Sequence, residues 1–284
     1  MLRLVFFKSS APRVGVPSPT RCFVTQGWDN APFFDTCRAM KYEPPLQHGL
    51  LLRRYKRFLA DLQLPSGEVL TVHCPNTGSM LNCLVPESPC WYSLSDNPKR
   101  KLPGTLELVT TATGGLACVN THRANALVEE ALRDERIPAL SGYDTLRREV
   151  RYGNENSRID LLLEDEARGR CYIEVKSVTL GLEQGWGAFP DAVTLRGLKH
   201  LRELMAVAAD GHRAVLFFCV LHDDVERVSP AAHIDPAYAA GVAEALAAGV
   251  EVMAWKARLS PEELRLDRPL PFELEPEPGF LRES

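Results

Sequence analysis

Long hydrophobic runs are missing from this chain of 284 residues. The longest, AVLFFCVL at 214–221, has the length of a buried strand, whereas a membrane-spanning helix needs roughly 18 apolar residues or more. The sequence therefore predicts no transmembrane helix. With 45% hydrophobic and 25% charged residues, the composition is that of a globular protein with a buried core.

Paired cysteine motifs are also missing. The eight cysteines are scattered without a repeated spacing, so they predict neither a disulfide framework nor a structural zinc site. His73, Cys74, Cys83 and Cys90 are close in sequence but lack the paired spacing that zinc ligands need, and we assign them no metal. We expect reduced thiols and a cytoplasmic protein.

The chain as a whole lacks an excess of positive charge, since its formal net charge is −4. The charge is uneven, however: residues 1–39 carry +3, residues 40–115 carry +2 and residues 116–284 carry −9. Contacts with a polyanion must then come from local basic clusters rather than from the overall field.

The first 39 residues show no regular hydrophobic period and are interrupted by Ser, Pro and Gly. We expect 1–39 to be a disordered extension, either a presequence or sequence upstream of the true start. We favour the second, because Met40 opens the periodic sequence abruptly.

Residues 40–115 contain short β-type runs separated by turn residues, which favours a small barrel or sandwich. Two basic clusters lie in this part, RRYKR at 53–57 and KRK at 99–101. They can bind phosphates together only if the fold brings them together, and a solvated strand face explains either cluster equally well alone.

Residues 116–262 alternate between helical and strand patterns, which predicts an α/β domain. The expected helices are 121–134, 194–209 and 236–248, and the expected strands are 146–152, 158–164, 171–178, 214–221 and 250–258. Residues 263–284 are rich in Pro and Glu and are predicted to form a tail, disordered over its last ten or so residues.

The run CYIEVKS at 171–177 places two charges inside an otherwise apolar strand. Burying a charge is costly unless it is paired or functional. A short polar connection joins this strand to SRIDLLL before it, so the two strands should be neighbours. If Asp160 shares the face of Glu174, the two carboxylates come within reach of one divalent cation.

Such a site would suit phosphodiester chemistry. Mg²⁺ or Mn²⁺ prefers a few carboxylates together with water and phosphate oxygens, and Asp160, Glu174 and the Val175 carbonyl supply oxygen ligands. The metal would activate a bound water, and Lys176 would orient that water and offset charge in the transition state. The alternative is a structural Glu–Lys pair, the better interpretation of an isolated E-x-K.

The order of parts resembles the PD-(D/E)XK nuclease superfamily, with Glu130 on a first helix, then Asp160, then EVK at 174–176. The wider sequence is similar to the sugar fermentation stimulation protein A (SfsA) family from about Pro44 to Leu259. The similarity is carried by RRYKRFLAD, HCPNTGSM, SDNPKRK, LSGYDTLRREVRYGNENSRID, CYIEVKSVTL, FPDAVTLRGLKHLREL and SPAAHIDPAYA.

This resemblance implies an N-terminal OB-fold barrel followed by an α/β nuclease-like domain, non-specific DNA binding, and a regulatory role in sugar (maltose) fermentation. The catalytic set would be Asp160, Glu174, Lys176 and Glu130, with Asp160 and Glu174 holding the metal. The expected nucleic-acid contacts are Arg53, Arg54, Lys56, Arg57, Lys99, Arg100, Lys101, Arg158 and Lys199.

Two functional hypotheses follow: a Mg²⁺- or Mn²⁺-dependent nuclease acting on DNA or RNA, and a DNA-binding regulator that keeps the nuclease scaffold without turnover. A structural ion pair with no chemistry is the third interpretation. For Asp191 we favour an N-terminal helix cap over a contact to the site, and for His200 and His222 an ordinary structural role.

Overall fold

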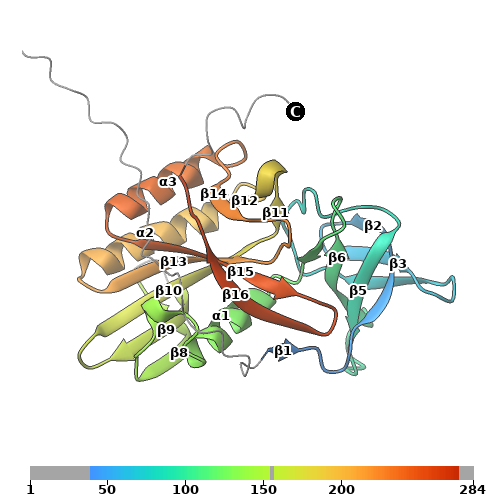
Figure 1. Cartoon of the computed structure of the whole chain (residues 1–284), viewed down its shortest axis with the longest axis horizontal. Helices are drawn as coiled ribbons and strands as arrows, with labels where there is room; N and C mark the ends of the chain where they lie inside the picture. The colour runs from blue at the N-terminus through green and yellow to red at the C-terminus, as the bar shows by residue number, and fades with distance from the viewer. Residues whose placement is uncertain (1–38, 154–156, 275–284) are drawn as a thin grey trace, which may run out of the picture. The chain divides into compact units, whose positions relative to one another are not determined.

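A computed structural model describes residues 39–153 and 157–274, which belong to one compact unit, Thr36–Ser284 (Figure 1). The extension predicted at 1–39, apart from Ala39, and the end of the predicted tail lie outside the described residues. Within the described residues, no helix is long and apolar enough to cross a membrane.

The front of the chain forms a closed five-stranded barrel of the OB type. Its strands follow the order β4-β3-β2-β5-β6, and the pairing of β4 with β6 at His73 and Thr105 closes the ring. The strands are β2 (Gln47–Tyr55), β3 (Leu59–Gln63), β4 (Val69–His73), β5 (Ser88–Leu94) and β6 (Gly104–Thr110). The predicted small barrel is therefore confirmed.

The back of the chain is an α/β domain with a seven-stranded mixed sheet in the order β1-β16-β15-β13-β10-β9-β8. Its strands are β1 (Met40–Lys41), β8 (Thr145–Tyr152), β9 (Ser157–Asp165), β10 (Gly169–Val178), β13 (Arg213–Val220), β15 (Glu251–Leu259) and β16 (Glu263–Leu270). A three-stranded sheet comprises β11 (Leu180–Gly181), β12 (Trp186–Phe189) and β14 (Arg227–Pro230).

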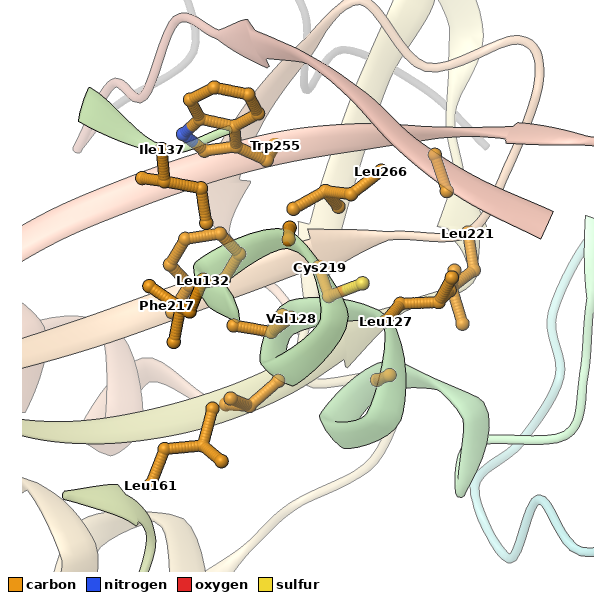
Figure 2. Packing of buried hydrophobic residues seen from close by; sticks show 14 of the residues in the cluster. Leu127, Val128, Leu132, Ile137, Leu161, Phe217, Cys219, Leu221, Trp255 and Leu266 are labelled. Atoms are coloured by element: carbon orange, nitrogen blue, oxygen red, sulfur yellow. The ribbon is translucent and has the colours of Figure 1, made fainter. Parts of the chain in front are cut away.

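Helix α1 (Arg123–Arg133) covers one face of the large sheet. Its apolar positions recur at helical spacing, so one side of the helix is buried. Figure 2 shows Leu127, Val128 and Leu132 pointing from α1 toward the side chains of the sheet. Those sheet residues include Phe217, Cys219, Leu221, Trp255 and Leu266.

Helices α2 (Leu195–Ala209) and α3 (Pro236–Ala247) cover the opposite face, where their apolar residues join a second core cluster. Thr194 caps α2 by accepting a hydrogen bond from the Gly197 amide at 2.9 Å. The N-cap predicted at Asp191 is therefore wrong, because the helix begins at Leu195 and its N-cap lies three residues after Asp191. Two short 3₁₀ turns, Pro138–Leu140 and Glu183–Gly185, complete the helical segments.

Both boundaries of the α/β domain differ from the sequence prediction. Strand β7 (Leu116–Cys118) pairs with β6 and so extends the barrel wall past residue 115. Residues 263–270, predicted as tail, form β16 between β15 and β1. The proline and charged residues of this segment hid the strand pattern, because only its leucines, Leu264, Leu266 and Leu270, are buried.

Replacing Leu264 with Ala should destabilise the fold, since its side chain is fully buried in the core cluster beneath α1. We expect the free energy of unfolding to fall by about 2–5 kcal/mol, the usual loss for such a truncation. Urea unfolding measures it. Leu274→Ala, at a position 40% exposed, should change stability by less than about 0.5 kcal/mol, and equal effects would contradict the role of β16.

Candidate metal and nucleic-acid site

The predicted site lies where β9 and β10 stop pairing. Their antiparallel ladder ends at Ile173 and Leu161, and the same register places Glu174 opposite Asp160. At that point the Val175 amide donates a hydrogen bond of 2.8 Å to Asp160 Oδ2 instead of to a strand carbonyl. The Asp160 carboxylate therefore occupies the gap between the two strands.

A backbone irregularity in β8 accompanies this gap. Glu149, which the β8–β9 register places opposite Asp160, has a left-handed φ of 52°, a conformation that a residue other than glycine rarely adopts. The face alternation reverses here. Leu161 packs in the cluster under α1, whereas Ile159 packs in the cluster under α2 and α3. Side chains of both faces thus converge on one end of the sheet.

Glu174 and Lys176 meet at this end with a partner from α2. Lys176 Nζ donates to Glu174 Oε1 at 2.7 Å, and His200 Nδ1 bonds the same carboxylate oxygen. His200 Nδ1 also lies 3.1 Å from Lys176 Nζ. His200 is therefore part of the site, although its sequence context favoured an ordinary role. Glu174 is bonded from α2 and Asp160 from α1. The Glu174 charge raises the pKa of Asp160, so the two carboxylates lie near one another although their helix partners come from opposite faces of the sheet.

The two carboxylates differ in their acidity. Burial raises the pKa of Asp160 to about 6, and the Glu174 charge acts in the same direction. Burial also acts to raise the pKa of Glu174, but the Lys176 charge and the His200 hydrogen bond outweigh it and lower that pKa. Near neutral pH both carboxylates are therefore mainly ionised, and Asp160 is the costlier one to ionise.

Helix α1 contributes Asn125 to the site. Its Nδ2 donates to Asp160 Oδ1 at 2.8 Å. Glu130, the acid predicted on this helix, instead accepts a hydrogen bond of 2.6 Å from Arg136 Nη2. Five helical positions separate the two residues, which turns Glu130 about 140° away from Asn125 around the helix axis. Asn125 is thus the α1 side chain with a hydrogen bond to Asp160, and its polar position in the first turn of the helix was the available signal.

A barrel loop reaches the same region and helps to line a cavity of about 250 Å³. The cavity is lined by Asn76, Thr77, Gly78, Thr121, Ala124, Asn125, Val175, Lys176, Ser177, Thr179, Phe189 and Asp191. The loop is held by Asp191, whose Oδ2 accepts from the Met80 amide at 3.1 Å and whose carbonyl accepts from Ser79 Oγ at 2.6 Å. Asp191 therefore joins the barrel to the α/β domain.

The first basic cluster is only partly available to a ligand. Arg54 donates to the carbonyls of Asn76 and Gly78, each at 2.8 Å, and so supports the cavity loop. Arg53 pairs with Asp61 at 2.8 Å. Lys56 and Arg57 are exposed in the β2–β3 turn, where both have positive φ. Structural roles therefore account for two of the four cations.

The remaining predicted contacts lie on separate elements. Lys99, Arg100 and Lys101 are exposed between β5 and β6, and Arg100 Nη2 donates to Thr105 Oγ1 at 2.9 Å. Lys199 lies on α2 beside His200, and Arg158 is exposed on β9 two residues before Asp160. Arg158 and Lys199 are thus the members closest in sequence to the site residues.

The donor set fits a hard cation that completes its shell with other oxygens. Among residues 39–153 and 157–274, no three His, Cys, Asp or Glu side chains cluster as a ligand set. Glu174 Oε2, however, is buried and has no hydrogen-bond partner. Mg²⁺ is commonly bound by one or two carboxylates plus water and phosphate oxygens, and the arrangement matches that requirement.

The protein thus belongs to a class with two domains: an OB-type barrel, and an α/β domain that carries Asp160 and the E-x-K sequence 174–176 at the ends of two adjacent strands. Residues 52–119 match the family model described as the SfsA N-terminal OB domain, and residues 122–263 match the sugar fermentation stimulation protein RE domain. The chain belongs to the sugar fermentation stimulation protein (SfsA) family.

Its relatives include the sugar fermentation stimulation protein homolog of Shewanella baltica (strain OS185), 59% identical over 227 residues, 80% of this chain and 97% of the relative. The homolog of Shewanella sp. (strain MR-7) is 59% identical over 232 residues, 82% of this chain and 99% of the relative. The structure of Pyrococcus furiosus SfsA in complex with Ca²⁺ matches with a TM-score of 0.74 at 28% identity, covering 83% of this chain and 98% of that one.

Asp160→Asn should stabilise the metal-free protein increasingly as the pH rises. The pKa of Asp160 is raised from its ordinary value of 3.8 to about 6 in the folded protein, so the wild type loses stability as the pH rises from 3.8 to about 6. We expect the difference in unfolding free energy between the variant and the wild type to grow by at most roughly 3 kcal/mol between pH 4 and 8.

Urea unfolding across that pH range measures the difference, and Asp144→Asn, at an exposed position, is the control. A difference between Asp160→Asn and the wild type that stays constant with pH would contradict the buried charge.

Asp191→Ala should loosen the cavity loop, because it leaves the Met80 amide without its acceptor. The expected loss of stability is about 1–3 kcal/mol, with faster hydrogen exchange at 76–83. Gly78→Ala should act on the same contact, since a Cβ at Gly78 would lie 2.1 Å from the Asp191 carboxylate oxygens. In the Asp191→Ala background, Gly78→Ala should therefore cost less than in the wild type, and additive losses would contradict the contact.

Proposed function

We propose that this chain binds DNA non-specifically through its phosphates and holds one phosphodiester at Asp160, Glu174 and Lys176 for hydrolysis that depends on Mg²⁺ or Mn²⁺. The observation that carries the proposal is the pair of carboxylates opposite one another at the end of β9 and β10, with Glu174 Oε2 buried and unpartnered. An orphaned buried carboxylate oxygen is costly unless a cation is meant to meet it.

Asp160 and Glu174 would hold the divalent cation, and the Val175 carbonyl is a further oxygen donor at the same end of β10. A bound divalent cation lowers the pKa of its water and offsets phosphate charge. The Ca²⁺ complex of the Pyrococcus furiosus relative supports a hard-cation site in this family. Carboxylate and carbonyl oxygens favour Mg²⁺, Ca²⁺ or Mn²⁺ over softer metals.

Lys176 and His200 would act on the phosphodiester and on the attacking water. The Lys176 side chain is 11% exposed and lines the cavity, so its ammonium can face a phosphate oxygen while it bonds Glu174. His200 is buried against Glu174 and Lys176, so it orients both side chains. The charge that develops on the phosphate would be met by the ammonium in a largely dry setting.

The barrel and the exposed basic residues would supply the DNA contacts. Lys56, Arg57, Lys99, Arg100 and Lys101 are exposed on the barrel, and contacts with phosphates position a nucleic acid without reading its sequence. Binding should then be salt-dependent and tolerant of sequence, and it could extend to RNA. A role in regulating sugar fermentation would use the same non-specific binding.

A second candidate function is DNA binding without turnover. Glu174 Oε1 already accepts bonds from Lys176 and His200, so one of the two carboxylate oxygens is satisfied within the protein itself. A DNA-binding regulator that kept the nuclease scaffold could hold Glu174 with these two bonds alone and would not need a metal. Measurements of metal binding and of cleavage separate the two functions.

Lys176→Ala should reduce phosphodiester cleavage by about 10²–10³-fold while leaving DNA binding nearly unchanged, because the ammonium is needed mainly where charge develops. Plasmid, single-stranded DNA and RNA are incubated with the full chain in Mn²⁺ or in EDTA, and binding is measured by mobility shift. Lys41→Ala, at an exposed position on β1, is the matched control.

Glu174→Gln should abolish Mn²⁺ binding in calorimetry, which gives a readout independent of cleavage. Metal binding and DNA retardation without cleavage of any substrate by the wild type would favour the second candidate. Cleavage by Lys176→Ala at the wild-type rate would reject the assigned site.

A further inference from the structure

Two arginines stand directly opposite each other near the candidate site. In the antiparallel pairing of β8 with β9, Arg151 is the partner of Arg158, and both side chains are exposed. Side chains at such positions are about 5 Å apart at Cβ, and like charges placed there repel one another. A pair of this kind is unfavourable unless an anion lies between the two cations.

The other two arginines of β8 each have an acid. Arg147 pairs with Glu164 at 2.9 Å, and Arg148 pairs with Glu129 at 3.1 Å. No carboxylate within 39–153 or 157–274 forms an ion pair with Arg151 or Arg158. In β8, Arg147 and Arg148 are therefore each paired with a carboxylate, whereas Arg151 faces another arginine.

The strand geometry places this pair on the side of Asp160 that α1 occupies. Residues 158 and 160 are two positions apart, so their side chains lie on the same face. Ile159, between them, packs on the opposite side, in the cluster under α2 and α3. Asp160 is bonded by Asn125 of α1. The arginine pair and the Asp160 carboxylate are thus successive features along one edge of the site.

We propose that Arg151 and Arg158 together bind one phosphate group of a nucleic-acid strand, next to the phosphodiester held at Asp160. The inference rests on the proposed function and narrows its substrate class. A single phosphate between two guanidinium groups accepts several charge-assisted hydrogen bonds and cancels their repulsion. The substrate is then an oligonucleotide with a phosphate flanking the scissile one, and a dinucleotide with a single phosphate is a poor substrate.

The test compares Arg151→Ala, Arg158→Ala and the double variant with Arg147→Ala and Arg148→Ala, which remove the same charge from the same strand. Binding of a single-stranded 20-mer is measured in Ca²⁺ as a function of salt. Losing one phosphate contact lowers the slope of log K against log salt by about 0.7 for a single strand. At 0.1 M salt that change corresponds to roughly fivefold weaker binding.

We expect Arg151→Ala and Arg158→Ala each to lower the salt slope by this amount. The double variant should lower it no further, because both side chains hold the same phosphate. The two control variants should keep the wild-type slope. In the absence of nucleic acid, Arg158→Ala should raise the melting temperature by relieving the repulsion, whereas Arg148→Ala should not.

Each other outcome has a definite meaning. Wild-type binding with Arg151 and Arg158 variants indistinguishable from the controls would overturn the inference and leave the proposed function standing. If the double variant lowered the salt slope twice as much as either single variant, the two arginines would make independent phosphate contacts, and the inference of a shared phosphate would be overturned. No binding of any nucleic acid by the wild type would reject the proposed function, and the inference with it.

Discussion

The hydrogen bond from the Val175 amide to the Asp160 carboxylate is the contact on which the candidate site depends. A buried strand must satisfy every backbone amide. Here a side chain takes the place of the neighbouring strand's carbonyl, so the two strands separate without leaving a donor unpaired. The gap lets α1 reach Asp160 from one face while α2 reaches Glu174 from the other. In a continuous ladder the two residues would be cross-strand partners on the same face of the sheet, so only one of the two helices could reach them.

The barrel and the α/β domain are built around a common wall. Strand β6 contributes Leu106 to the barrel core, while Leu108 on the same strand packs in the cluster under α1. Near this wall, the cavity loop is attached to the α/β domain by Asp191 and by the Asn76–Thr179 hydrogen bond. The barrel is thus a structural part of the candidate site, and it places loop atoms beside Lys176.

Much of the fold was predictable because its signals are local. The alternation of SRIDLLL and CYIEVKS marks two strands, and the helical periods of α1, α2 and α3 lie within single segments. Non-local contacts were not predictable in this way. Strand β16 is recognisable only once β15 and β1 are beside it, and Arg54 looks like a phosphate ligand until the carbonyls of the cavity loop surround it. Glu130 was a reasonable expectation from helix position alone, but the angle about the axis favours Asn125.

The sequence by itself determined the family and the barrel followed by an α/β domain, and it pointed to Asp160, Glu174 and Lys176 as the centre of the candidate site. Each of these three conclusions depends on which residues are present and on their spacing along the chain, and both can be read before the chain folds. Only the tertiary structure decided that His200 joins Glu174 and that the left-handed Glu149 reverses the strand faces beside Asp160. It also decided that Arg151 faces Arg158. These features depend on strand register and helix rotation, which are set by packing between segments far apart in sequence.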